Sequence, residues 1–64
     1  MNQNNITIAI DAMGGDNSPF KCLKGAEIFN TKIQNIKIIL LGDKNIIEQN
    51  IEKHKIQISN YEII

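Results

Sequence analysis

The chain has 64 residues and a formal net charge of zero, so its composition does not indicate a nucleic-acid-binding protein or a polybasic membrane-binding segment. A globular chain of this length buries only about 60% of its unfolded surface, so its stability as an isolated unit would be marginal. Two common means of stabilising such a small fold are excluded, because one cysteine cannot form an internal disulfide and one histidine cannot build a zinc site.

The ends of the chain and its apolar runs bear on where the protein resides. Residues 1–5 are polar and uncharged, unlike a signal peptide, and the longest apolar run, residues 38–41, is far too short to span a bilayer. We therefore expect a cytoplasmic protein. The chain stops on Tyr-Glu-Ile-Ile, where a strand would be under way, so we expect it to be a fragment of a larger protein.

The first predicted elements are a strand, a loop and a helix. Isoleucines alternate with small residues over 6–10, which predicts a β-branched strand, and residues 11–17 follow as a loop. Ser18 is the predicted N-cap and Pro19 the predicted first helical residue of a helix reaching about Thr31 or Ile33. Its apolar stripe consists of Cys22, Leu23, Ala26, Phe29 and Ile33. On that stripe Cys22 is expected to pack rather than to act as a nucleophile.

The rest of the chain predicts two strands and a second helix. The near-continuous apolar run over 36–41 favours a strand that is covered on both faces, as in a parallel sheet. Asp43 is a predicted N-cap for a helix over 44–53, and a third strand is expected to begin near Ile56 or Tyr61. The order β-α-β-α-β predicts an α/β layered domain with a parallel sheet and right-handed crossovers, without an internal domain boundary.

The loop after the first strand is the candidate site. Loops at the carboxyl ends of parallel strands face the binding crevice of an α/β sheet, and this one leads into a helix N-terminus, which favours an anion. Two adjacent glycines let a ligand approach the backbone closely, so phosphate is the natural candidate. The candidate phosphate-binding residues are Asp11, Gly14, Gly15, Asp16, Asn17 and Ser18.

The two carboxylates complicate a phosphate site, because they repel an anion directly. Asp11 and Asp16 could instead hold a metal, orient an amide or a lysine, accept a proton, or merely support the strand end and the turn. The loop contains neither G-x-G-x-x-G nor G-x-x-x-x-G-K-[ST], which excludes the standard dinucleotide fingerprint and the P-loop. A sugar-kinase phosphate turn is disfavoured too, because Ser18 and Pro19 predict the start of a helix, whereas a hairpin strand follows the turn in that family.

Three segments together resemble the start of the bacterial phosphate acyltransferase of phospholipid synthesis. They are IAIDAMGGDNSP over 8–19, KGAEIF over 24–29 and IKIILLGD over 36–43. The resemblance covers essentially the whole chain, which would be about the first fifth of a family member. It implies a Rossmann-like α/β/α fold, with residues 1–64 as the N-terminal fragment of one larger domain.

The resemblance also implies an activity and partners. The family forms acyl-phosphate from acyl-(acyl carrier protein) and inorganic phosphate, works as a homodimer, and is cytoplasmic with peripheral membrane association. It assigns no catalytic role to any residue here, and we expect no cofactor and no metal. The alternative is a non-catalytic product of a truncated or split gene that acts only by associating with other chains.

Four further side chains have less specific interpretations. His54 is expected to be a solvated residue at a helix C-terminus, and Lys21 and Lys24 are expected to be surface lysines. Met13 either packs under the loop or lines an acyl passage.

Overall fold

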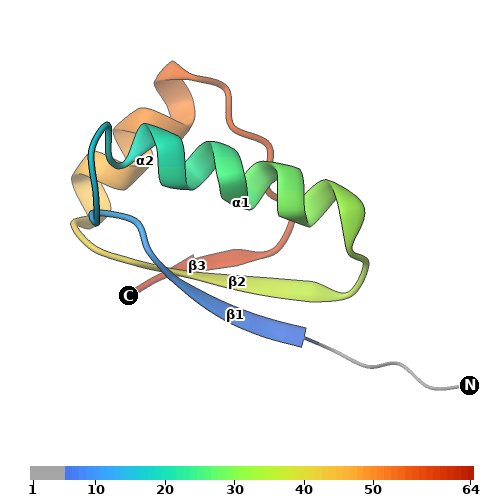
Figure 1. Ribbon diagram of the computed structural model, residues 1–64. Helices are drawn as coiled ribbons and strands as arrows, with labels where there is room; N and C mark the ends of the chain where they lie inside the picture. The colour runs from blue at the N-terminus through green and yellow to red at the C-terminus, as the bar shows by residue number, and fades with distance from the viewer. Residues whose placement is uncertain (1–5) are drawn as a thin grey trace, which may run out of the picture.

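The computed structural model describes residues 6–64, so the prediction about a signal peptide at residues 1–5 lies outside the described residues. The order is β-α-β-α-β, as predicted (Figure 1). The elements are β1 (Ile6–Asp11), α1 (Phe20–Lys32), β2 (Ile36–Leu41), α2 (Lys44–Lys53) and β3 (Tyr61–Ile63). The predicted bounds of the second strand and the second helix are confirmed.

The three strands form one parallel sheet in the order β1-β2-β3. In its register, Ile8 lies beside Ile38, and Ile38 lies beside Tyr61. Hydrogen bonds continue past the strand ends, because the Ala12 N–H donates to the Leu41 carbonyl at 3.0 Å. The carboxyl ends of the strands therefore lie together at one edge of the sheet, as the α/β prediction requires.

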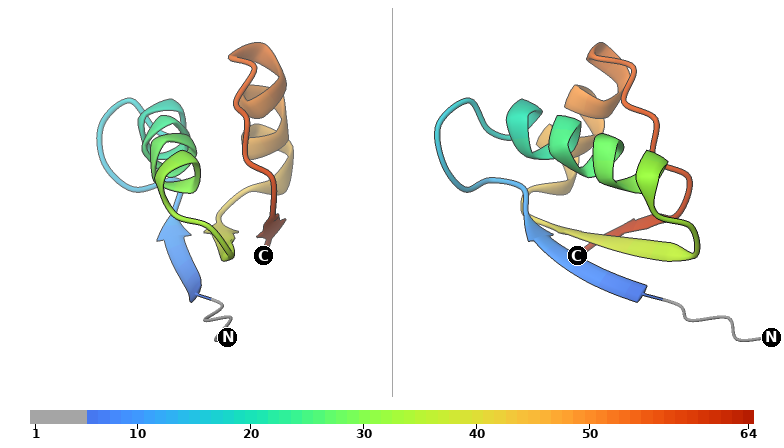
Figure 2. Two further views of the ribbon diagram at one scale, coloured as in Figure 1. Left: turned by 90° about the vertical axis from the view of Figure 1, so that its right-hand side faces the viewer. Right: turned by 45° about the vertical axis from the view of Figure 1, so that its right-hand side comes forward.

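Both helices lie on the same face of the sheet (Figure 2). Alternate residues of β2 point at them and are buried, and the core is completed by side chains from both helices and the loops. The buried core consists of Ala12, Leu23, Ala26, Ile36, Ile38, Leu40, Ile47 and Ile56. At roughly 1.5–3 kcal/mol for each fully buried Leu or Ile side chain, this layer is the main source of stability within residues 6–64.

The prediction that β2 is covered on both faces is wrong for the described residues. Ile36, Ile38 and Leu40 are buried, whereas Ile39 is half-buried and Leu41 is 39% exposed. The physical reason is that both crossover helices pack on one face, so the residues pointing the other way have no helix over them. Residues 6–64 thus form two layers, a sheet and a helical layer.

Two side chains of α1 fasten that helix to the segment between α2 and β3. The carboxylate of Glu27 accepts a hydrogen bond from the Gln57 N–H at 2.9 Å, and the side-chain oxygen of Asn30 accepts one from the Ser59 N–H at 2.8 Å. The ammonium of Lys24, 2.8 Å from the Glu27 carboxylate, lowers the pKa of Glu27, and the bond from Gln57 lowers it further.

No helix within residues 6–64 has the length and hydropathy needed to cross a membrane.

Candidate functional site

The candidate loop joins the carboxyl end of β1 to the start of α1 (Figure 1). Its first residue, Ala12, is buried and bonded to β2, which anchors the loop to the sheet edge. Residues 13–17 are exposed, and Pro19, just before the helix, is buried. The sequence therefore places an exposed arch between two buried anchors.

Asp11 folds the first half of this arch. Its side-chain Oδ1 accepts a hydrogen bond from the Met13 N–H at 3.1 Å, and its carbonyl accepts one from the Gly14 N–H at 3.3 Å. A Cβ at Gly14 would lie 3.2 Å from the other carboxylate oxygen of Asp11, a tight contact. The structure thus gives Asp11 a positioning role within the loop, and it explains why a residue without a side chain suits position 14.

The carbonyl of Gly14 is held by the beginning of the following helix. The Ser18 hydroxyl donates a short hydrogen bond to this carbonyl, and the Cys22 thiol donates to it at 3.5 Å. The predicted N-cap role of Ser18 is wrong, because its oxygen bonds backward into the loop and makes no cap bond to α1. The helix starts at Phe20 with Pro19 at the N-cap position, one residue later than predicted.

Cys22 is half-buried at the edge of the apolar stripe, where Leu23 and Ala26 are the buried members. Its thiol contacts the loop, lying 3.8 Å from the Ser18 hydroxyl. The expected packing role is therefore only part of what the side chain does, since it also helps to fix the Gly14 carbonyl.

The second half of the arch offers backbone donors. Within residues 6–64, no N–H from Gly15 through Ser18 donates to another protein atom. Gly15 and Asn17 have φ angles of 85° and 62°, in the left-handed region. Successive N–H groups in such alternating conformations form a concavity that binds anions. The backbone N–H groups of the loop are thus better suited to bind an anion than the carboxylates of Asp11 and Asp16 are.

Asp16 is exposed in the second half of the arch. In the described part of the chain, no three His, Cys, Asp or Glu side chains lie close enough together to hold a metal ion. For Asp11 the structure agrees with a role in holding the loop, whereas it assigns Asp16 no contact within residues 6–64.

Met13 connects the arch to the end of β2. A Cβ at Gly42 would lie 2.5 Å from the Cγ of Met13, so the Met13 side chain packs directly over this glycine. Gly42 has a φ of 149°, which L-residues rarely adopt. Of the two interpretations of Met13, packing under the loop agrees with this contact.

A hollow of about 520 Å³ lies where the start of α1 meets the end of α2. It is lined by Asn17, Ser18, Phe20, Lys21 and His54. The rings of Phe20 and His54 are in contact, with centroids 4.2 Å apart and planes at 45°. The sequence predicts His54 as a solvated residue at a helix C-terminus, and it is the exposed C-cap residue of α2, but the contact with Phe20 is not predicted. Helical spacing carries no signal for this contact, because the angle between α1 and α2 is set by how both pack on the sheet.

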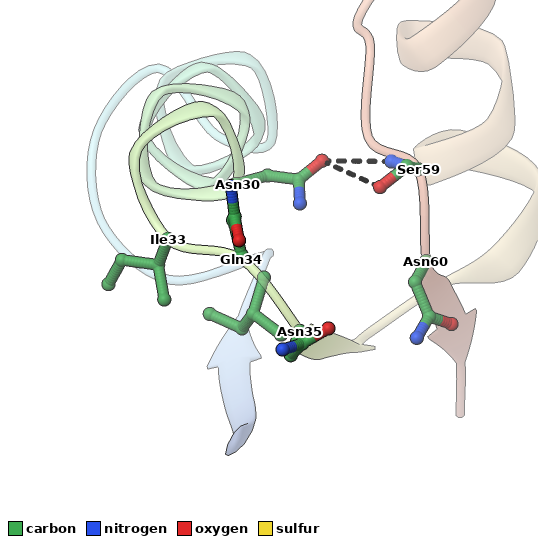
Figure 3. A pocket seen from close by; sticks show the side chains of 7 residues that line it. Asn30, Ile33, Gln34, Asn35, Ser59 and Asn60 are labelled. Carbon is green, nitrogen blue, oxygen red and sulfur yellow. Dashed lines mark hydrogen bonds between the residues drawn. The ribbon is translucent and has the colours of Figure 1, made fainter. Parts of the chain in front are cut away.

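A second hollow, of about 500 Å³, lies near the amino ends of β2 and β3 (Figure 3). Its polar lining consists of Asn30, Gln34, Asn35, Ser59 and Asn60. Asn30 reaches from α1 to Ser59, accepting from its N–H and, at 3.4 Å, from its hydroxyl. The bonds between Asn30 and Ser59 join α1 to the chain before β3, at the end of the sheet opposite the candidate loop.

Comparison with known proteins identifies relatives of this segment. A family model described as fatty acid synthesis protein matches residues 6–64. The phosphate acyltransferase of Parvibaculum lavamentivorans is 39% identical over 59 residues, which are 92% of this chain and 16% of that protein. That of Fusobacterium nucleatum is 38% identical over 56 residues, or 88% and 17% of the two chains, and that of Oenococcus oeni is 55% identical over 38 residues, or 59% and 11%.

The chain therefore spans less than a fifth of the length of each of these relatives. No solved structure matches it.

Proposed function

This chain belongs to the fatty acid synthesis protein family, and we propose that it is the N-terminal segment of a phosphate acyltransferase that forms acyl-phosphate from acyl-(acyl carrier protein) and inorganic phosphate. The observation that carries the proposal is the loop at the carboxyl edge of the sheet, whose N–H groups from Gly15 through Ser18 have no protein acceptor within residues 6–64. The family match includes this loop.

The proposed chemistry is acyl transfer from a thioester to phosphate. A phosphate oxygen attacks the thioester carbonyl, the carbon–sulfur bond breaks, and the thiolate of the carrier's pantetheine arm leaves. Inorganic phosphate is already a competent nucleophile, so the protein contributes mainly positioning and stabilisation of developing negative charge. The role we assign to Gly15 and its neighbours is to hold phosphate, or the developing oxyanion, with backbone N–H groups.

Asp11, Asp16 and Gly14, which lies between them in the sequence, complete the proposed site. Asp11 shapes the loop through its bond to Met13, Gly14 lets the turn close against that carboxylate, and Asp16 is exposed. Asn17 and Ser18 contribute backbone donors. We assign no metal and no cofactor to this loop.

The test is a pair of substitutions at Gly15 in the intact gene product. Gly15 has a left-handed φ and nothing within 4 Å of the position of a Cβ, so any effect reports backbone conformation rather than crowding. Gly15→Val disfavours this φ strongly, whereas asparagine tolerates it. We expect Gly15→Val to raise the KM for phosphate or lower kcat by about tenfold, the effect of losing one charge-assisted hydrogen bond.

The matched control, Gly15→Asn, should stay close to the unmodified enzyme in both parameters. Unchanged kinetics in a correctly folded Gly15→Val variant would contradict the proposed role of the loop.

The same proposal includes the partner, the oligomeric state, the location and the domain organisation that the family resemblance implies. The acyl carrier protein would be the partner, the protein would be a cytoplasmic homodimer with peripheral membrane association, and residues 1–64 would belong to one larger α/β domain. The mass of the native gene product separates this from the alternative of a non-catalytic product. A mass several times the 7.2 kDa of this chain favours the enzyme, whereas 7.2 kDa with no companion chain favours the alternative.

A further inference from the structure

We infer that the hollow between the start of α1 and the end of α2 binds a phosphate group, with Lys21 as its counter-charge and His54 as a hydrogen-bonding partner. The inference rests on the proposed function, because that function requires phosphate and a phosphate-bearing pantetheine arm. The hollow has a volume of about 520 Å³, which is large enough for either.

No side chain that lines the hollow carries a negative charge. Its five residues include one lysine and one histidine and no carboxylate. The two lysines of the first turns of α1 differ in this respect, since the ammonium of Lys24 lies 2.8 Å from the Glu27 carboxylate. Within residues 6–64, Lys21 takes part in no ion pair. Its charge therefore remains available to an anion in the hollow.

The polar groups of the hollow come from two separate elements. Asn17 and Ser18 belong to the end of the loop, and the Asn17 carbonyl accepts a hydrogen bond from the Lys21 N–H at 3.0 Å, which fixes the loop against the helix. His54 comes from the far end of α2, where its own N–H donates to the Asn50 carbonyl at 3.0 Å. A ligand here would bridge both helices.

Phe20 gives the hollow an apolar wall next to the imidazole of His54. Phe20 is 38% exposed, and its ring lies against that of His54. His54 is exposed beside this contact, so a ring nitrogen can still hydrogen-bond to a phosphate oxygen. The apolar wall formed by Phe20, beside the ammonium of Lys21, suits a phosphate carried on an organic arm as well as the free ion.

The experiment measures phosphate binding to the intact gene product and to three variants. Backbone amide shifts are followed by NMR during titration with inorganic phosphate and, separately, with pantetheine 4′-phosphate, at constant ionic strength in chloride. The variants are Lys21→Gln, His54→Gln and the control Lys32→Gln, which lies in the last turn of the same helix and outside the hollow. Circular dichroism confirms the fold of each.

The inference predicts that Lys21→Gln raises the Kd of a phosphate probe about tenfold, as expected for loss of a charge-assisted hydrogen bond. His54→Gln should raise it by a smaller factor, and Lys32→Gln should leave it unchanged. If both probes respond, the hollow accepts free phosphate. If only pantetheine 4′-phosphate responds, the occupant is the carrier's arm.

An unchanged Kd in both Lys21→Gln and His54→Gln overturns the inference, as does binding whose shifts are confined to residues 13–16. Acyl-phosphate formation is assayed in parallel, so that the two proposals fail separately. If Lys21→Gln is active with an unaltered KM and binds phosphate as before, the inference about the hollow is wrong and the proposed function stands. If phosphate binding depends on Lys21 but no acyl-phosphate forms, the inference about the hollow is supported and the proposed function is wrong.

Discussion

Gly25 and Gly42 occupy very different surroundings, although each lies within or directly beside a regular element. Gly25 is in the interior of α1, and a Cβ added there would meet nothing within 4 Å. At Gly42 a Cβ would lie 2.5 Å from the Met13 Cγ and 3.2 Å from the Ile47 Cδ1, at a φ of 149°. The same substitution should therefore have opposite effects at the two positions.

We predict that Gly25→Ala stabilises the chain. Alanine restricts the unfolded backbone more than glycine does and adds no contact here, so the free energy of unfolding should rise by about 0.5–1 kcal/mol. Urea unfolding followed by far-UV circular dichroism measures the change. A loss of stability would show that something packs closely against this face of α1.

Gly42→Ala should instead lower the free energy of unfolding by about 1–3 kcal/mol, because the added methyl group overpacks the contact with Met13. The variant Met13→Ala, combined with Gly42→Ala, removes the obstructing side chain. The double variant should lose less stability than the sum of the two single variants. Strict additivity would contradict the packing of Met13 on Gly42.

Glu27 makes the stability of the chain depend on pH. Lys24 and the Gln57 N–H lower the pKa of this carboxyl in the folded state, so the unfolded state binds more protons in the acid range. The stabilisation is complete above the ordinary glutamate pKa of about 4.3 and is lost as the pH falls through the lowered value.

Glu27→Gln should therefore remove part of the decrease in unfolding free energy below about pH 4. Urea unfolding at a series of pH values tests this expectation. Lys24→Met removes the main cause of the shift and should flatten the same acid limb to a lesser degree. An unchanged acid limb in Glu27→Gln would mean that other carboxyls determine it.

At the scale of elements, the two helices begin in different ways. Asp43 caps α2 by accepting the Ile46 N–H at 3.1 Å, as the sequence predicts. At α1 the predicted cap, Ser18, is engaged with the Gly14 carbonyl instead. Local sequence shows that both residues can accept a helix N–H, but only the fold of the loop decides which of them does.

We predict that Asp43→Ala lowers the free energy of unfolding by about 1 kcal/mol and that Asp43→Asn changes it little, since the amide oxygen can accept the same bond. Hydrogen exchange of the α2 amides locates the effect. Faster exchange should appear in the first turn of α2. If α1 were to exchange faster to the same extent, the change would be global rather than a lost cap.

The elements that the sequence predicts well are those whose causes are local. The span of β2 follows from an apolar run that ends at Gly42, and the span of α2 follows from the Asp43 cap and the spacing of Ile47 and Ile51. The one-sided covering of β2 has a non-local cause, the placement of both helices on one face. Similarly, the order of the elements predicts the position of the loop at the sheet edge, but only the structure brings His54 beside Phe20.

At the scale of the whole molecule, the sheet has one covered face and one without helices in residues 6–64 (Figure 2). The second face carries a mixture of small, charged and apolar side chains, and the ammonium of Lys37 lies 3.1 Å from the Glu62 carboxylate on it. Parallel sheets are nearly always covered on both faces. Relatives are also several times longer than this chain. Both facts support the proposal that residues 1–64 are part of one larger domain.

That proposal predicts that Ile39→Lys depends on context. Ile39 is half-buried on the face without helices, so in the 64-residue chain the change should cost little, within about 1 kcal/mol of other surface substitutions. In a chimera where residues 6–64 replace the matching segment of the Parvibaculum lavamentivorans relative, it should cost about 3 kcal/mol or more, because the charge would be buried against further layers of the domain.

Thermal unfolding of both proteins measures the two costs, with Ile38→Lys as the control. Ile38 is fully buried under the helices in residues 6–64, so its substitution should be severe in either context. A small cost for Ile39→Lys in the chimera as well would mean that this face remains in contact with solvent. The segment would then be a two-layer unit attached to the rest of the enzyme, because a shared sheet would have to bury Ile39.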